Sequence, residues 1–226
     1  SLATERDSIY FEYVFLTILV WSIILSFLNY LNLITKKITK TMDLILASSS
    51  PRRKRILTEL GYNFKCISPD IDESNIDNLK PINYVLNISE NKASYIWNRN
   101  KKNCVLAGDT IVDFNNEIIG KPSSQSEAFK IIKKLSNQTH SVISGLSLFL
   151  DGEAINIFDK TDVTFKKLSK PIIENYIESF DVLDKAGAYN IEDAENILIK
   201  HIDGCYNNIV GFPLKKFKMS KIKKIL

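Results

Sequence analysis

Four cations stand together at residues 52–55, within the stretch LILASSSPRRKRIL that covers residues 44–57. The apolar residues 44–46 are typical of a buried strand, and Ser50 followed by Pro51 is typical of a helix N-cap with proline in the first turn. Cations at a helix N-terminus oppose its partial positive charge unless an anion binds there. Backbone N–H groups, serine hydroxyls and arginine side chains all bind phosphate oxygens. The stretch therefore predicts a polyanion site, and the alternative is a solvated basic surface.

Carboxylates farther along the chain supply groups that hydrolysis of a polyanion needs. Asp109 ends the apolar run VLAG, where a buried charge is unfavourable unless it meets a cation or a metal ion. Asp72 and Glu73 lie in the acidic turn PDIDESN. Carboxylates without a histidine at metal-ligand spacing indicate a hard cation, Mg²⁺ or Mn²⁺. Lys92 and Lys121 are candidate phosphate ligands, although a single lysine is more often solvated, and a single aspartate more often caps a helix or forms a turn.

The pattern of apolar residues predicts the elements that position these side chains. Helical spacing indicates helices at 51–60, 81–98, 123–135 and 171–180. Apolar or alternating runs indicate strands at 44–46, 62–68, 104–114, 140–152 and 153–165, with a turn at Asp151-Gly152. Because strands and helices alternate along the chain, we expect an α/β fold with a mixed sheet. In this framework, residues 108–110 interrupt a strand, and Lys121 ends the next one.

Composition limits the class of protein. The chain has 226 residues, of which 45% are hydrophobic and 25% charged, which suits one globular domain or two small lobes. Its net charge is only +4, and we interpret the basic tail KKFKMSKIKKIL as a solvated helix end and not as a nucleic-acid-binding arm. Three cysteines without a C-x-x-C pair indicate reduced thiols in a cytosolic protein. His140 and His201 have no metal-ligand partners at a known spacing, which disfavours a zinc site and a Ser-His-Asp triad.

The first 41 residues differ from the rest. Residues 13–35 carry no charge over a length that can span a bilayer, and KKITK follows them, as in a membrane anchor with its basic side in the cytoplasm. In the alternative, which we favour, Met42 is the functional start, and residues 1–41 are upstream sequence included by a wrong start choice. We therefore expect one domain at 42–226, and a membrane as a partner only if residues 13–35 are present in the protein.

Taken in order, the motifs of this domain resemble those of the Maf family of nucleoside triphosphate pyrophosphatases. They are LASSSPRR, DIDE, ENKA, AGDTIV, GKP, LDKAGAYNI and GCYNNIVGFPL. The resemblance covers roughly residues 43–214. It implies a two-lobed α/β structure around a mixed, twisted sheet, related to the inosine triphosphate pyrophosphatases, with the site in a cleft. It also implies a cytoplasmic enzyme, commonly a homodimer, that takes a nucleoside triphosphate and no nucleic acid.

The same resemblance assigns roles to residues of this chain. Asp109 matches the family's proton acceptor, which takes a proton from the attacking water or, with Glu73, holds the divalent metal ion. The positions that match the family's basic cleft residues and phosphate loop are Lys92, Lys121, Ser48, Ser50 and Arg53. The implied reaction is attack of water at the α-phosphorus, which gives the monophosphate and pyrophosphate.

Substrate choice stays open at this point. In the branch that resembles dTTP/UTP pyrophosphatases, base selection goes with an arginine in the loop, a threonine after the aspartate, and a glutamine. Arg52 and Thr110 match the first two, but Glu192 stands in place of the glutamine, and an ionised carboxylate only accepts hydrogen bonds. The 7-methyl-GTP branch carries a glutamate there, yet has an aromatic residue in place of Arg52. The sequence is therefore mixed, with dTTP and UTP among the candidates.

A protein of another class remains an alternative to the enzyme. The family name is also attached to regulators of cell division and septum formation, so the chain is alternatively a nucleotide-binding regulator without catalysis. Such a regulator needs the cations but not the carboxylate of Asp109. The substitution Asp109→Asn therefore distinguishes the two hypotheses.

Overall fold

The structure is a computed structural model that describes residues 20–26, 28, 43–71 and 79–226. The chain divides into two compact units, residues 1–42 and 43–226. In the first unit, residues 20–26 and 28 are helical, and their large apolar side chains are exposed. Among the helices within the described residues, none has the length and apolar character that a membrane crossing requires. Most of the predicted span lies outside the described residues, as do Asp72 and Glu73.

Within the described part of the second unit, one sheet contains seven strands. They are β1 (Leu44–Ala47), β2 (Phe64–Cys66), β3 (Cys104–Phe114), β4 (Glu117–Ile119), β5 (Thr139–Leu150), β6 (Glu153–Phe165) and β7 (Ile199–Asp203). Their spatial order is β2-β1-β3-β5-β6-β7, with β4 paired to β3. Strand β1 is parallel to β2 and β3, whereas the remaining pairs are antiparallel. The predicted α/β fold with a mixed sheet is therefore confirmed.

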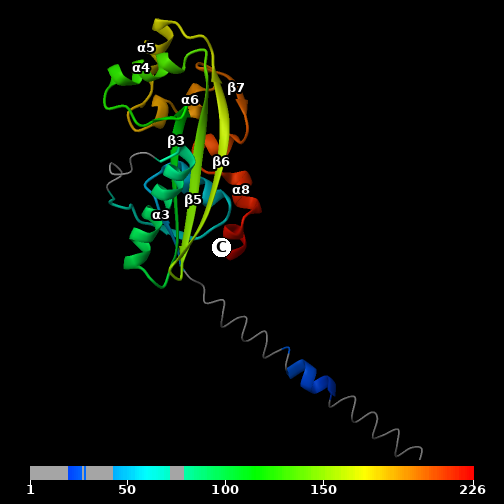
Figure 1. Ribbon diagram of the computed structural model, residues 1–226. Helices are drawn as coiled ribbons and strands as arrows, with labels where there is room; N and C mark the ends of the chain where they lie inside the picture. Colours follow the sequence, from blue (N-terminus) through cyan, green and yellow to red (C-terminus); the bar gives the residue numbers. More distant parts are fainter. Residues whose placement is uncertain (1–19, 27, 29–42, 72–78) are drawn as a thin grey trace, which may run out of the picture. The chain divides into compact units, whose positions relative to one another are not determined.

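Helices flank this sheet, and the four that the sequence predicts begin and end within two residues of the expected bounds. The helices are α2 (Pro51–Glu59), α3 (Pro81–Arg99), α4 (Gln125–Leu135), α5 (Lys170–Ser179), α6 (Ile191–Ala194), α7 (Tyr206–Val210), α8 (Leu214–Met219) and α9 (Lys221–Ile225), with a 3₁₀ turn, η1, at Ala186–Ala188. Along the long strands β5 and β6, helices α4 and α5 lie toward one end, and α3 and α8 toward the other (Figure 1). The domain is thus two-lobed.

Alternate residues of each strand enter different apolar clusters. Leu44 and Leu46 of β1 pack in the largest cluster with residues from α2, α4, α5 and α8, whereas Ile45 and Ala47 pack with residues of α3. This alternation follows from the two-residue period of a strand. Helix α3 therefore covers one face of the sheet near β1, and the other helices pack against the opposite face. Because both faces are covered, β1 is buried along its whole length.

A gap in the edge of the sheet is the feature that matters most for function. Strand β3 pairs with β1 through residues 104–107 and with β4 through residues 112–114. Among the described residues, no strand pairs with 108–111 on that edge, although β5 pairs with them on the other. The prediction that 108–110 interrupt β3 was therefore wrong, because the strand is continuous and only its neighbours on one edge are separated. Asp109 lies in the middle of this gap.

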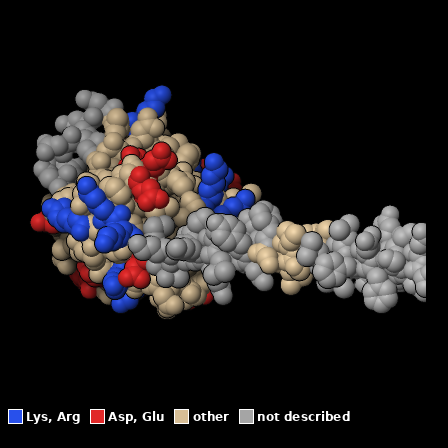
Figure 2. Space-filling view, turned by 90° about the horizontal axis from the view of Figure 1, so that it is seen from below, with Lys and Arg blue, Asp and Glu red and all other residues tan. Residues whose placement is uncertain are grey.

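The basic tail is helical and solvated, as expected. The six lysines of α8 and α9 are exposed, while Phe217 and Ile222 are buried and anchor the two helices to the core. On the face drawn in Figure 2, Lys and Arg side chains are interspersed with Asp and Glu side chains. The described residues on the face drawn in Figure 2 therefore form no continuous positively charged patch.

Candidate active site

A cleft of about 870 Å³ opens at the gap in the sheet. It is lined by residues from the loop after β1, the first turns of α2, helix α3, the middle of β3, the segment after β4 and the segment around α6. The predicted site residues that line it are Ser48, Ser50, Arg52, Arg53, Lys92, Asp109, Thr110, Lys121 and Glu192. The structure therefore brings together all predicted site residues that it describes. Glu73 lies outside the described residues, so its place is not assigned.

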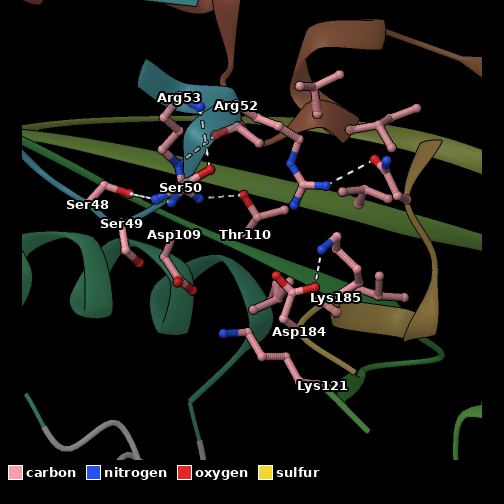
Figure 3. A pocket seen from close by; sticks show the side chains of 18 of the residues that line it. Ser48, Ser49, Ser50, Arg52, Arg53, Asp109, Thr110, Lys121, Asp184 and Lys185 are labelled. Atoms are coloured by element: carbon pink, nitrogen blue, oxygen red, sulfur yellow. Dashed lines mark hydrogen bonds and ion pairs between the residues drawn. The ribbon is translucent and has the colours of Figure 1, made fainter. Parts of the chain in front are cut away.

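Two groups of side chains are distinct in the close view of the cleft. Ser48, Asp109 and Thr110 lie with the Arg53 guanidinium on one side, whereas Lys121, Asp184 and Lys185 lie on the other (Figure 3). The first group, together with Ser50, Ser144 and Lys92, is named the β3 cluster below. A third set of residues that line the cleft is named the α6 cluster. It consists of Arg52, Arg55, Asn190 and Glu192.

The loop after β1 ends in the helix cap that the sequence predicts. The hydroxyl of Ser50 accepts from the backbone N–H of Arg53 at 3.4 Å, and Pro51 occupies the first turn of α2. The backbone N–H of Ser50 donates to the hydroxyl of Ser48 at 3.2 Å, which holds the loop closed. The first turn of α2 contains no acidic residue. This helix end therefore presents N–H groups and cations to the cleft, the arrangement that binds phosphate.

Arg53 is committed to the protein itself. Its side chain is only 9% exposed, and Nε donates to the carbonyl of Gly211 at 2.9 Å. Its two terminal nitrogens donate to the hydroxyls of Ser48 at 3.2 Å and Thr110 at 2.9 Å. One guanidinium thus joins the loop after β1, strand β3 and the end of α7. Arg53 therefore holds the loop after β1 in place against β3 and α7.

Gly108 and Gly211 make room for this guanidinium. A Cβ on Gly108 would lie 3.0 Å from Arg53 Nε and 2.8 Å from Leu146 Cδ2, closer than side chains pack. Gly211 has φ +110° at the C-terminus of α7, a left-handed conformation that favours glycine. The two glycines therefore fix how Arg53 lies beneath the cleft.

The hydroxyl of Thr110 is fully used as a donor. Ser144 is fully buried and donates to the carbonyl of Asn208 at 2.7 Å. Ser144 has only one hydroxyl proton, and the Asn208 carbonyl accepts it. In the 2.8 Å contact between the two hydroxyls, Thr110 must therefore be the donor, and its oxygen accepts a hydrogen bond from Arg53. Thr110 consequently has no proton left to donate to a substrate. This network links the bottom of the cleft to α7.

Asp109 and Lys92 form an ion pair at the surface of the cleft. Lys92 Nζ lies 2.9 Å from Asp109 Oδ1, and both side chains are about one seventh exposed, at 13% and 14%. Lys92 comes from α3, which covers the face of the sheet to which Asp109 points. The pair places a carboxylate and an ammonium beside the phosphate loop.

A divalent metal ion fits the donors here only in part. Within the described residues, no group of three or more His, Cys, Asp and Glu side chains is placed to hold a metal. Mg²⁺, however, is commonly held by one or two carboxylates together with substrate phosphates and water. Asp109 offers one such carboxylate, and the second oxygen of its side chain is not the one that contacts Lys92. The hard oxygen donor therefore suits Mg²⁺ or Mn²⁺ when a phosphate completes the site.

Lys185 is a cleft residue that the sequence analysis missed. Its side chain is 15% exposed, lines the cleft and pairs with Asp184, with Lys121 nearby (Figure 3). Burial raises the pKa of Asp184, but the hydrogen bond and charge of Lys185 outweigh this and leave the pKa below its usual value. The available signal was its place in the motif LDKAGAYNI, where a lysine directly follows an aspartate. Two lysines thus face this side of the cleft.

The α6 cluster cross-links α2 to α6. Arg52 donates to Asn190 Oδ1 at 3.0 Å, and Arg55 donates from a terminal nitrogen to Glu192 Oε1. The hydrogen bond from Arg55 lowers the pKa of Glu192 below its usual value. The Nε of Arg52 is buried without a hydrogen-bond partner among the described residues. Asn190 and Arg55 were not predicted as site residues, because only the folded chain brings these helices together.

Tyr189 is a buried residue that lines the cleft and packs against the core. Its hydroxyl lies 2.8 Å from His140 Nε2, and the two rings pack edge to face with Phe165. Burial lowers the pKa of His140 to about 4, so the imidazole is neutral at pH 7. His140 is therefore a buried residue of the core beneath the cleft.

Comparisons with known proteins show which family this chain belongs to. The family described as Maf-like protein matches residues 43–220. A protein of Thermosipho melanesiensis named dTTP/UTP pyrophosphatase is 41% identical over 175 residues, which cover 77% of this chain and 94% of that protein. A protein of Clostridium botulinum with the same name is 40% identical over 182 residues, with 77% and 93% covered.

Among solved structures, a HAM1 protein from Coxiella burnetii aligns with a TM-score of 0.47 and 15% identity, over 82% of this chain and all of that chain. The Ham1 protein of Staphylococcus aureus aligns with a TM-score of 0.39 and 16% identity, over 54% of this chain and 71% of that chain. The family match covers well over half of the chain and nearly all of the second unit. This chain belongs to the Maf family.

Proposed function

We propose that this chain is a nucleoside triphosphate pyrophosphatase that hydrolyses the bond between the α- and β-phosphates. The observation that carries the proposal is that Asp109, Lys92 and the N-terminus of α2 line the same cleft. A carboxylate next to a phosphate-binding helix end supplies both groups that the reaction needs. The named activity of relatives that align over more than nine tenths of their length supports the same conclusion.

In this proposal Asp109 accepts the proton of the attacking water. Lys92, 2.9 Å from one carboxylate oxygen, holds the side chain in place and leaves the other oxygen for the water. Attack at the α-phosphorus expels pyrophosphate, and the monophosphate keeps the new oxygen. A positioned carboxylate of this kind contributes about 10²- to 10⁴-fold to a rate.

Cations around the cleft bind the triphosphate and stabilise the charge that develops on the leaving pyrophosphate. We assign this role to the first turn of α2 with Ser48 and Ser50, and to Lys121 and Lys185 on the other side. In the alternative role, the same oxygen of Asp109, together with Glu73, would hold a divalent cation such as Mg²⁺ or Mn²⁺ in place of accepting the proton. When bound, this ion would neutralise phosphate charge and polarise the phosphoryl group.

Substitution of Asp109 tests the proposal. The full chain should release pyrophosphate from UTP or dTTP in the presence of Mg²⁺ or Mn²⁺, and Asp109→Asn should reduce kcat by about 10²-fold or more. The matched control Asp203→Asn changes an exposed carboxylate outside the cleft and should keep full activity. Full activity of Asp109→Asn would refute this mechanism. Nucleotide binding without any hydrolysis by the unmodified chain would instead favour the regulator.

We also propose that the enzyme acts in the cytoplasm as a homodimer and that residues 1–41 lie outside the catalytic domain. Cys66, Cys104 and Cys205 are unpaired, the state expected in a reducing compartment. Light scattering of the purified protein measures the assembly, and a mass of one chain would contradict the dimer. Residues 42–226 expressed alone should keep full activity, whereas an inactive product would contradict the proposed boundary.

A further inference from the structure

The acceptor and donor groups of the α6 cluster suit a nucleobase better than a phosphate. Glu192 lines the cleft, and its lowered pKa keeps the carboxylate ionised at neutral pH. An ionised carboxylate repels phosphate oxygens but accepts hydrogen bonds from the N–H groups of a base. We therefore place the base beside α6.

Glu192 alone lacks something that a base-reading residue needs. Uracil and thymine present a ring N–H beside a carbonyl oxygen, so their recognition takes one acceptor and one donor side by side. A glutamine amide supplies both, but a carboxylate supplies only the acceptor. A bare carboxylate at this place would also repel the carbonyl oxygen of the base.

Arg55 stands where the missing donor is needed. It lies one turn farther along α2 than Arg52, lines the cleft and donates to Oε1 of Glu192. A guanidinium has five N–H donors, and a carboxylate has about four acceptor positions, so one contact leaves capacity on both groups. Their side chains are 50% and 35% exposed, which leaves them open to a ligand.

The surrounding contacts fix the pair in place. Arg52 bonds to Asn190 at 3.0 Å, and Asn190 donates in turn to Asp193 at 2.9 Å, so the start of α6 is held against α2. Glu59 Oε1 lies 3.9 Å from Arg55 Nε, so Arg55 has a second carboxylate neighbour one turn along α2. Both partners therefore meet the cleft in a defined arrangement.

We propose that Arg55 is a specificity-determining residue that acts with Glu192 as one recognition pair. Glu192 accepts from the ring N–H of the base, and Arg55 donates to the adjacent carbonyl oxygen. The pair does the work of a carboxamide and selects uracil or thymine over bases that carry an amino group instead. This inference rests on the proposed function, because it concerns the choice of base at the same cleft.

UTP and CTP are matched probes, because their bases differ at only two neighbouring positions. Uracil has a carbonyl oxygen beside a ring N–H, whereas cytosine has an amino group beside a ring nitrogen without a proton. We expect the full chain to favour UTP in kcat/KM, and Arg55→Ala to reduce the UTP to CTP ratio by roughly 10- to 100-fold. The loss should lie in KM for UTP, with kcat retained, because the contact is remote from the reacting phosphorus. Arg99→Ala removes an exposed arginine outside the cleft and should leave the ratio unchanged.

The double substitution Arg55→Ala/Glu192→Gln is the decisive variant. A glutamine supplies its own donor, so the UTP preference should return although Arg55 is absent. A ratio that Arg55→Ala does not change, or a preference of the unmodified chain for CTP, would overturn the inference. If the unmodified chain releases no pyrophosphate from any nucleoside triphosphate, the proposed function itself fails, which is a distinguishable result.

Discussion

The β3 cluster and the α6 cluster line one cleft, but their side chains are held in different ways. Arg53 in the β3 cluster is 9% exposed and bonded to a carbonyl and two hydroxyls, and Ser144 beneath it is fully buried. In the α6 cluster, the side chains of Arg55 and Glu192 are 50% and 35% exposed, and Glu192 lies on a helix of only four residues. Buried networks tolerate little change, because each lost partner leaves an unsatisfied group.

This difference suggests a division of labour. In our proposal, the hydrolysis step, which is common to all nucleoside triphosphates, depends on a continuous strand with a buried network behind it. In our proposal, the choice of base depends on exposed side chains between two helices, where substitutions cost little stability. We therefore expect the α6 cluster to tolerate a glutamate in place of a glutamine when a neighbour supplies the missing donor.

Loss of Arg53 should produce the largest effect. Arg53→Ala leaves the Gly211 carbonyl and two hydroxyls without their donor, which we expect to reduce the free energy of unfolding by about 3 kcal/mol or more. Arg53→Lys should not rescue it, since an ammonium cannot span these partners in a plane. Urea unfolding measures both variants. Arg55→Ala is the control, and its urea midpoint should equal that of the unmodified chain. Equal losses of unfolding free energy for Arg53→Ala and Arg55→Ala would contradict the distinction between the two clusters.

The buried His140 should give stability a pH dependence. Its pKa is about 4 in the folded state, where burial disfavours the charged form, against about 6.5 in the unfolded chain. The unfolded state therefore binds an extra proton below pH 6.5, and stability falls by about 3 kcal/mol as the pH drops from 6.5 to 4. In the variant His140→Gln, the free energy of unfolding should depend less on pH between 6.5 and 4. Urea unfolding at several pH values measures this dependence. The exposed His201 is the control, and a slope equally reduced by His201→Gln would contradict the assignment.

A methyl group at Gly108 should have a smaller effect. The new Cβ would press against Leu146 and Arg53, and overpacking of this kind costs about 1–3 kcal/mol. Gly120→Ala is the matched control, because a Cβ there would meet nothing within 4 Å. Thermal unfolding compares the two. If Gly108→Ala is as stable as Gly120→Ala, the packing around Arg53 is looser than the distances indicate.

Local signals in the sequence predicted the elements well. Ser50 and Pro51 marked the start of α2, and Asp151-Gly152 marked the β5–β6 turn, where both residues have positive φ. These features depend on neighbours in the chain. The motifs of the family likewise indicated which residues line the cleft.

Contacts between distant residues were not predictable in the same way. Arg53 and Gly211 are 158 residues apart, and Arg55 and Glu192 are 137 apart. Nothing near Arg53 in the sequence distinguishes a buried, fully bonded arginine from a phosphate ligand. The break in the sheet edge also escaped prediction, because it depends on where β1 and β4 end beside β3. The role of each cation therefore emerged only from the fold.

The position of water attack tests the central claim most directly. Hydrolysis of UTP or dTTP in water enriched in ¹⁸O, followed by mass spectrometry of both products, shows which phosphorus takes the new oxygen. We expect one ¹⁸O atom in the nucleoside monophosphate and none in the pyrophosphate, because the proposed reaction is attack of water at the α-phosphorus. Label in pyrophosphate, or release of labelled inorganic phosphate as the first product, would contradict the proposed reaction.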